Sequence, residues 1–395
     1  MPNALQQMQF FRFDQMATQV KDKVEPKDAS VARYVGLEHI DPGSLKIRRW
    51  GKPSDVDSSK ILFRSGDIIF GKRRAYQRKL AVADFNGICS AHAMVLRPKT
   101  DVILAEFLPF FMQSDIFMDR AVKISVGGLS PTINWGDLAK EEFFLPPLEE
   151  QRQIAEVLQA AQETRESLQS LKDQVQLQRD PLATEVIWRG VPPTGRGLLP
   201  KDWPLPSSWK LGRVDDVVRF RGGSQPPRST FVYEAQSGYV RLLQIRDYKS
   251  DENLTFIPED KARKRCSVED IMIGRYGPPL FQILRGLEGA YNVALIKAEP
   301  DESLVDREYL YHFFRQSRLH DLIDHMSTRS AGQAGIEMDV LKNYPIPLPP
   351  LAVQAEIAQQ FSALDVLSES IEQRMAAIGG VSECISRDLR GGATA

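Results

Sequence analysis

The sequence lacks the features of membrane and secreted proteins. No apolar run approaches the roughly 20 residues that a bilayer-spanning helix needs. The start, Met1 to Phe13, has neither a basic segment nor an apolar stretch of the kind that directs secretion, so we expect a cytoplasmic protein. The three cysteines, Cys89, Cys266 and Cys384, form no CxxC pair, which predicts reduced thiols rather than a disulfide framework.

A strong charge of either sign is also missing. The net charge is −1, but residues 1–147 carry 21 basic and 17 acidic side chains, whereas residues 148–195 carry 5 and 8. Residues 196–350 are nearly balanced and residues 351–395 are acidic again. Because neither excess is extreme, local clusters must indicate the partner.

Signatures of catalysis are incomplete. The segment Gly66–Lys72 has the glycine and lysine spacing of a phosphate-binding loop, but Arg73 stands where serine or threonine must hold magnesium. The segment Tyr276–Phe281 lacks the polar residue of an amino-methyltransferase motif. His320 and His325 do not share a helix face, and no carboxylate or cysteine set completes a metal site. We therefore expect no catalytic residue, no metal and no enzymatic activity in this chain.

An internal repeat is the most informative feature present. Pro146–Ala155 matches Pro349–Ala358 at an offset of 203, and the same offset places Asp67-Ile68 on Asp270-Ile271. Further short matches at this offset are spread over more than 100 residues, which chance does not produce. The chain therefore consists of two diverged copies of one unit.

Each copy begins with short apolar runs that predict strands. An amphipathic helix is predicted next, at about Ala105 to Val122 and at Arg307 to Met326. Strands mixed with helices indicate an α/β (mixed α+β) fold for both copies. The predicted strands are Ile61–Phe63, Asp67–Phe70 and Ala91–Leu96 in the first copy, and Val240–Ile245, Asp270–Ile273 and Ala290–Ile296 in the second.

Both copies end in a long predicted helix, with apolar residues that repeat every seven positions and so favour a coiled coil. The alternative is that each apolar stripe packs only on its own domain. Pro181 and Gly379-Gly380 are expected to bend or fray the two helices. The apolar positions are Ile154, Ala161, Leu168, Val175 and Leu182 in the first helix, flanked by Val157 and Leu171, and Ile357, Leu364, Ile371, Ile378 and Ile385 in the second, flanked by Leu367 and Val381.

These patterns divide the chain into five parts. The predicted parts are a domain at 1–147, a helix at 148–189, a Pro/Gly-rich linker at 190–206, a domain at 207–350 and a helix at 351–390.

Basic, aromatic and amide residues cluster at matching places in both copies, which predicts contacts with DNA phosphates and base edges. A solvated charged turn is the alternative. A polar Gly/Ser-rich loop precedes each long helix and could approach a ligand closely or serve only as a connector. The candidate residues are Lys46, Arg48, Arg49, Lys72, Arg73, Arg74, Tyr76, Gln77, Arg78, Lys79, Lys264, Arg265, Arg275, Tyr276 and Gln282 in the basic groups, and Ser125, Gly127, Gly128, Ser130, Arg329, Ser330 and Gln333 in the loops.

With these features the sequence resembles the specificity subunit of type I restriction–modification systems. The resemblance rests on Leu145–Ala155 and Ile346–Ala358, together with Ser65–Ile68 and Pro206–Gly212. The second copy departs from the pattern with Ala352-Val353 in place of an acidic pair.

The resemblance implies two target-recognition domains that each bind half of a bipartite, asymmetric site on double-stranded DNA. The helices would form an antiparallel coiled-coil spacer with pseudo-two-fold symmetry and dock two methyltransferase subunits, which two translocase/nuclease subunits can join. S-adenosylmethionine, ATP and Mg²⁺ would be bound by those partners. Half-sites about one turn (34 Å) apart lie within reach of helices of roughly 50 Å.

Two alternatives stay open at this point. One is a specificity subunit of a methylation-only or phage-defence complex without a nuclease. The other is a protein–protein adaptor whose coiled coil mediates association.

Overall fold

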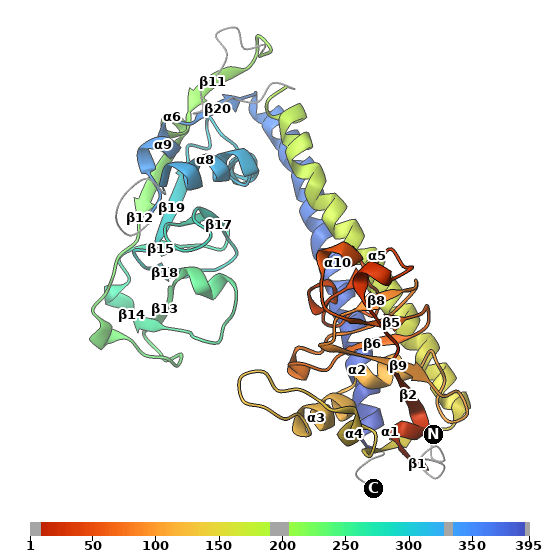
Figure 1. Ribbon diagram of the computed structural model, residues 1–395. Helices are drawn as coiled ribbons and strands as arrows, with labels where there is room; N and C mark the ends of the chain where they lie inside the picture. The colour runs from red at the N-terminus through yellow and green to blue at the C-terminus, as the bar shows by residue number, and fades with distance from the viewer. Residues whose placement is uncertain (1–8, 190–204, 328–334, 392–395) are drawn as a thin grey trace. The chain divides into compact units, whose positions relative to one another are not determined.

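The computed structural model describes residues 9–189, 205–327 and 335–391, and the chain forms two compact units (Figure 1). Unit 1 contains residues 1–170 and 371–395, and unit 2 contains residues 171–370. Each unit therefore combines one mixed α/β domain with a segment of both long helices. The predicted fold class is confirmed. The predicted linker, 190–206, lies mostly outside the described residues.

The two domains have the same order of elements. Unit 1 contains β1 (Gln9–Arg12), α1 (Phe13–Met16), β2 (Ala17–Val20), β3 (Lys23–Val24), β4 (Tyr34–Val35), β5 (Lys60–Phe63), β6 (Ile68–Gly71), β7 (Leu80–Val82), β8 (Gly87–Cys89), β9 (Ala93–Pro98), α2 (Leu108–Gln113), α3 (Asp115–Lys123), α4 (Trp135–Leu138) and β10 (Glu142–Leu145). Unit 2 contains β11 (Lys210–Arg213), α6 (Val214–Val217), β12 (Val218–Gly222), β13 (Tyr239–Leu243), β14 (Phe256–Pro258), β15 (Arg265–Cys266), β16 (Ile271–Gly274), β17 (Gln282–Leu284), β18 (Gly289–Tyr291), β19 (Leu295–Pro300), α7 (Arg307–Phe314), α8 (Ser317–Ser327), α9 (Met338–Lys342) and β20 (Pro345–Leu348). The long helices are α5 (Leu148–Val186) and α10 (Leu351–Gly391).

The sheets repeat as well. The order β2-β9-β6-β7 in unit 1 corresponds to β12-β19-β16-β17 in unit 2, and both sheets are antiparallel. The second sheet of each unit contains one parallel pair, β4 with β8 and β13 with β18. The copies differ at one edge, because β3 extends this sheet next to β5 whereas β14 extends it next to β13.

Strand β6 shows how the sequence builds the core. Its residues are all buried, and alternate side chains face opposite sides of the sheet. Ile68 and Phe70 pack with Phe111 and Phe117 of the helices, whereas Ile69 packs against the second sheet. Strand β16 repeats this alternation with Ile271 and Ile273 on one side and Met272 on the other. Because both sides of the strand are covered, its sequence is a continuous apolar run.

Two local predictions were wrong. Each predicted amphipathic helix is two helices, because Ser114 leaves the helical conformation and caps α3, and residues 315–316 separate α7 from α8. At the second break, the buried Gln316 accepts a hydrogen bond from the indole of Trp188. The predicted strands Ala91–Leu96 and Ala290–Ile296 each include a turn that precedes β9 or β19.

The long helices pair within each unit along the predicted apolar positions. The ten heptad residues are all buried or half-buried, whereas the flanking Val157, Leu171, Leu367 and Val381 are 40–48% exposed. The beginning of α5 lies with the end of α10 in unit 1, and the reverse holds in unit 2, so the paired segments run antiparallel. Pro181 and Gly379-Gly380 lie inside helices that continue past them.

A buried glutamine attaches each long helix to its domain. The Gln151 side chain accepts a hydrogen bond from the backbone of Leu104 at 2.9 Å and donates to the carbonyls of Val102 and Pro146 at 3.1 and 2.9 Å. Gln354 makes the equivalent bonds to Asp306, Leu304 and Pro349 at 2.8, 3.0 and 2.8 Å. The Pro-Pro-Leu-x-x-Gln motif is therefore a structural connection, because these glutamines satisfy backbone groups that water cannot reach.

Unit 2 also contains a charged network between its helices. Asp365 of α10 pairs with Arg179 of α5 and with Arg315, and Arg179 also lies 3.5 Å from Nδ1 of His312. Burial raises the pKa of Asp365. Hydrogen bonds and positive charge from the two guanidinium groups lower it by more, so the pKa lies below its usual value. Burial lowers the pKa of His312 to about 3, and the positive charges of Arg315 and Arg179 act in the same direction.

We expect Gln151→Leu to destabilise unit 1 by on the order of 3 kcal/mol, because a leucine leaves three buried backbone groups without a partner. Urea unfolding combined with hydrogen exchange of residues 102–106 measures this loss. The control is Gln159→Leu, since Gln159 is exposed on the same helix and its amide donates to the side chain of Glu163. Equal destabilisation by the two variants would contradict a connecting role for Gln151.

We expect unit 2 to lose stability as the pH falls from 6.5 to 4.5. The unfolded histidine takes up a proton near pH 6.5, whereas folded His312 remains neutral until about pH 3. The unfolded state therefore binds more protons in this window, and stability falls by up to about 1.4 kcal/mol per pH unit. Calorimetry at several pH values should show this slope, and His312→Phe should flatten it. An unchanged slope in the variant would assign the effect to another group.

Candidate nucleic-acid interface

The basic turn of unit 1, residues 72–79, follows β6 directly. Arg74 and Arg78 adopt the left-handed conformation at φ 55° and 54° on either side of a short 3₁₀ helix, Ala75–Gln77. Ala75 is buried in the domain core, whereas Arg74 is exposed and Tyr76 is 55% exposed. The buried alanine thus anchors a turn whose polar side chains reach the surface.

The polar loop before α5 lies against this turn. The backbone of Ile133 donates to Lys72 at 2.9 Å, and that of Arg74 donates to Pro131 at 2.7 Å. The hydroxyl of Ser130 accepts from the guanidinium groups of Arg73 and Arg74, both at 3.3 Å. Two candidate elements about 55 residues apart in sequence therefore form one surface, which we call the turn–loop surface (residues 72–79 and 124–133).

Unit 2 has the same backbone arrangement. Ile336 donates to the carbonyl of Arg275 at 3.4 Å, and Tyr276 pairs with Gly335 as Arg73 pairs with Thr132. All four residues match their unit 1 counterparts at the offset of 203. The candidates Arg329, Ser330 and Gln333 lie outside the described residues.

Other candidate cations of unit 1 contact groups of the protein itself. Lys46 and Arg48 pair with Glu166 of α5 at 2.8 and 2.9 Å, and Arg49 pairs with Asp41. Partial burial raises the pKa of Glu166, but hydrogen bonds from Lys46 and Gln162 and the charge of Arg48 lower it by more. The pKa of Glu166 is therefore below its usual value. The contacts of Lys46 and Arg48 attach the domain to its helix, whereas that of Arg49 lies within the domain. A role in DNA binding for the three residues stays a prediction.

The far end of the basic turn is similarly engaged. Arg78 pairs with Asp115 at the start of α3, and the ammonium of Lys79 donates to the carbonyl of Leu37 at 2.6 Å. Gln77 is half-buried beside them. Among the loop candidates, Ser125 donates to Val122 at 2.6 Å, whereas Gly127 and Gly128 are exposed.

The unit 2 candidates differ in their surroundings. Lys264 is exposed, and Arg265 pairs with Glu259 at 3.1 Å. Gln282 donates to Pro279 at 3.0 Å. Within the described residues, the Nε of Arg275 is buried and has no hydrogen-bond partner, and its guanidinium lies 5.4 Å from the ring of Tyr276.

The structure adds residues that the sequence did not reveal. In unit 1, Nε2 of His92 lies 3.2 Å from Arg73. In unit 2, Gln225, Gln244 and Asn292 line a cavity of about 580 Å³ together with Arg228. The cavity lies close to Arg275, whose backbone bonds to Ala294 beside Asn292. No local motif marks these residues, since they come from separate turns.

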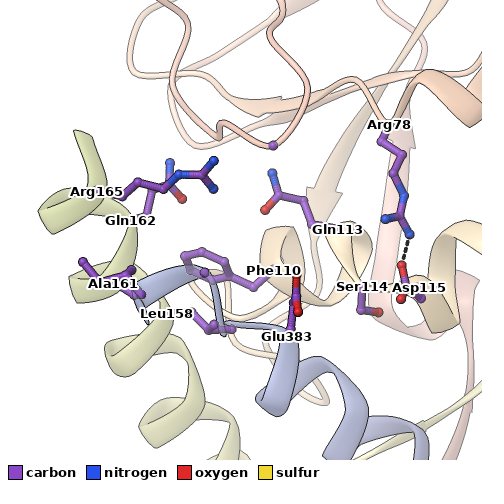
Figure 2. Close-up of a pocket in the computed structure, with 13 residues that line it drawn as sticks. Arg78, Phe110, Gln113, Ser114, Asp115, Leu158, Ala161, Gln162, Arg165 and Glu383 are labelled. Atoms are coloured by element: carbon purple, nitrogen blue, oxygen red, sulfur yellow. Dashed lines mark hydrogen bonds and ion pairs between the residues drawn. The ribbon is translucent and has the colours of Figure 1, made fainter. Parts of the chain in front are cut away.

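A further cavity of about 520 Å³ lies in unit 1 between the start of α3 and the long helices (Figure 2). Figure 2 shows Arg78 turned toward Asp115, with Gln162 and Arg165 on α5 and Glu383 on α10. Gln162 in its lining matches Asp365 of the charged network of unit 2 at the shared offset of 203. The cavity is therefore a polar gap at the base of the domain.

The described residues contain no group of three or more histidine, cysteine or acidic side chains able to hold a metal ion. Burial raises the pKa of Cys89 to about 12 and that of Cys266 to about 11, so neither thiol ionises near neutral pH. No helix among the described residues has the length and apolarity to cross a bilayer.

Comparisons with known proteins agree with this description. The type I restriction modification DNA specificity domain matches residues 20–177 and 206–379. The EcoKI specificity subunit of Escherichia coli K12 is 23% identical over 87% of this chain and 75% of its own length. The EcoDI specificity subunit of Escherichia coli is 30% identical over 39% of this chain, which spans only 34% of that protein.

A solved structure shows the same fold. The S subunit of a type I restriction–modification system from M. genitalium aligns over 98% of this chain and 97% of its own, with a TM-score of 0.65 and 15% identity. The two family matches correspond to the two repeats and together cover most of the sequence. The chain therefore belongs to the family of type I restriction–modification specificity proteins.

Proposed function

We propose that the chain is the DNA sequence-specificity subunit of a type I restriction–modification complex, with each unit reading one half of a bipartite, asymmetric site. One observation carries the proposal: the turn–loop arrangement recurs in both units on the same backbone contacts but with different side chains. Arg73 corresponds to Tyr276 and Thr132 to Gly335 at the shared offset. The same backbone contacts with different half-buried residues suit two domains that bind different half-sites.

The chemistry of the surface supports a duplex DNA ligand. Guanidinium groups bind phosphates and pair with the guanine edge, and amides pair with the adenine edge. Unit 1 offers Arg73 and Arg74, and unit 2 offers Arg275 with the amides of Gln225, Gln244 and Asn292. The two half-sites should therefore differ in base composition.

The long helices would set the spacing and hold the catalytic partners. Several of their apolar side chains remain exposed, including Leu177 at 72% and Val366 at 65%. Such side chains on paired helices fit docking of two methyltransferase subunits, and two translocase/nuclease subunits would join where the complex cleaves. S-adenosylmethionine, and ATP with Mg²⁺, would then bind to these partners. The complex would act where bacterial or archaeal DNA lies, in the cytoplasm.

The test is to express the chain with its methyltransferase subunits and map the methylated bases in cellular DNA. Two fixed half-sites with a constant spacer are the expected result. Binding should weaken steeply with added salt, because each neutralised phosphate releases counterions. Binding to another protein with no salt-dependent DNA affinity would support the adaptor alternative instead.

We expect the double variant Arg73→Ala, Arg74→Ala to weaken binding through one half-site by about 10-fold or more, because each well-formed base contact contributes about 1–3 kcal/mol. Arg275→Ala should do the same for the other half-site. Binding assays with DNA mutated in one half-site at a time distinguish the two.

The matched control for unit 1 is Arg64→Ala. Arg64 is exposed and precedes β6, at the end of this strand opposite to Lys72. It should leave both half-sites unchanged. If the turn variants lower methylation equally for every half-site sequence, these arginines do not read bases.

We expect one heptad inserted between Ser170 and Leu171, with a matched heptad between Ser370 and Ile371, to lengthen the spacer and leave the half-sites unchanged. Seven helical residues add about 10 Å, which corresponds to about three base pairs at 3.4 Å each. Methylation mapping of the variant gives the new spacer. Five-residue insertions are the control, since they turn the apolar positions by about 140° around the helix axis. An unchanged spacer would show that the length of the helices does not set the distance between the half-sites.

A further inference from the structure

Leu129 is the most exposed large apolar side chain among the described residues, at 97%. It lies in the loop of the turn–loop surface, and Val126 in the same loop is 64% exposed. Elsewhere in unit 1 the large aliphatic residues mostly enter the core. A leucine that is almost fully exposed to water, next to a serine that contacts two arginines, indicates contact with a ligand.

The loop that carries Leu129 is closed at its base. Val126 and Thr132 exchange two backbone hydrogen bonds, at 3.0 and 2.9 Å. Gly127 has a φ of 119°, which a side chain would rarely tolerate, and it turns the chain sharply before Leu129. The leucine is therefore presented on a formed loop and need not be ordered on binding.

Cations flank the leucine on the same surface. Its neighbour Ser130 accepts hydrogen bonds from Arg73 and Arg74, and Pro131 accepts one from the backbone of Arg74. Any polyanion held by these guanidinium groups would meet the leucine at the same time. Of the ligands that combine phosphates with an apolar interior, duplex DNA is the one this family reads.

We propose that Leu129 inserts between adjacent base pairs of the half-site bound by unit 1, while Arg73 and Arg74 hold the flanking backbone. This inference rests on the proposed function and adds a mechanism to it. Apolar wedges partly unstack a base step and kink the duplex, and the bent DNA offsets the cost of unstacking because it touches more of the protein surface. Leu129 would then favour flexible pyrimidine–purine steps without any hydrogen bond to a base.

The test uses the full chain assembled with its methyltransferase subunits, and duplexes that carry the mapped site. 2-Aminopurine, which brightens when it is unstacked, replaces one base at a time through the unit 1 half-site. The methylated base itself is not substituted, because methyltransferases flip their target base out of the stack. The wild-type complex should brighten the probe at one step. Leu129→Ala should remove that signal and weaken binding by about 10-fold, since alanine removes the apolar contact that the leucine would make with the bases. Leu129→Met should restore most of both effects.

The matched control is Leu304→Ala, because Leu304 is 44% exposed and lies in the other unit. It should change neither the probe signal nor the affinity. Specific binding with no brightening at any position, or brightening that persists in Leu129→Ala, would overturn the wedge while leaving the proposed function intact. Loss of methyltransferase assembly in Leu129→Ala, seen by native mass spectrometry, would assign the leucine to a protein contact and overturn it as well. If no sequence-specific binding occurs, the proposed function fails first.

Discussion

The buried glutamines Gln151 and Gln354 are the contacts on which the organisation of each unit depends. Each side chain forms hydrogen bonds with three backbone groups. One group lies between the last strand and the long helix, and the other two lie in the turn before α2 or α7. Because both amides are almost fully buried, a residue without that hydrogen-bonding pattern would leave those groups unpaired. The direction of the helix relative to its own domain is thereby fixed in both copies.

The two copies share a backbone arrangement but differ in the side chains that join each domain to the long helices. In unit 2 the domain is joined to the helices by the charges of Arg179, Arg315 and Asp365. In unit 1 the position that matches Asp365 holds Gln162, which lines a polar cavity. There, Lys46 and Arg48 reach Glu166 instead. The backbone arrangement is thus tolerant of side-chain exchange.

The basic residues of the turn in unit 1 divide into two groups with different contacts. Arg78 pairs with Asp115 and Lys79 bonds to a backbone carbonyl, so both have partners within the domain. The guanidinium groups of Arg73 and Arg74 contact the neutral Ser130, and that of Arg73 also contacts His92, so no acidic side chain of the described residues pairs with them. Positive charge without an acidic partner therefore lies at Arg73 and Arg74, although the total charge of the chain is −1.

The sequence by itself determined the duplication, the mixed α/β class, the apolar positions of both long helices and the family, because these depend on periodicity and short motifs. It also predicted the turn after β6 and the loop before α5 as candidates. Only the tertiary structure decided that these two elements meet, that Ser114 divides a predicted helix, and that Lys46 and Arg48 face Glu166. Such outcomes depend on contacts between residues far apart in the chain, where local propensity carries no information about the partner.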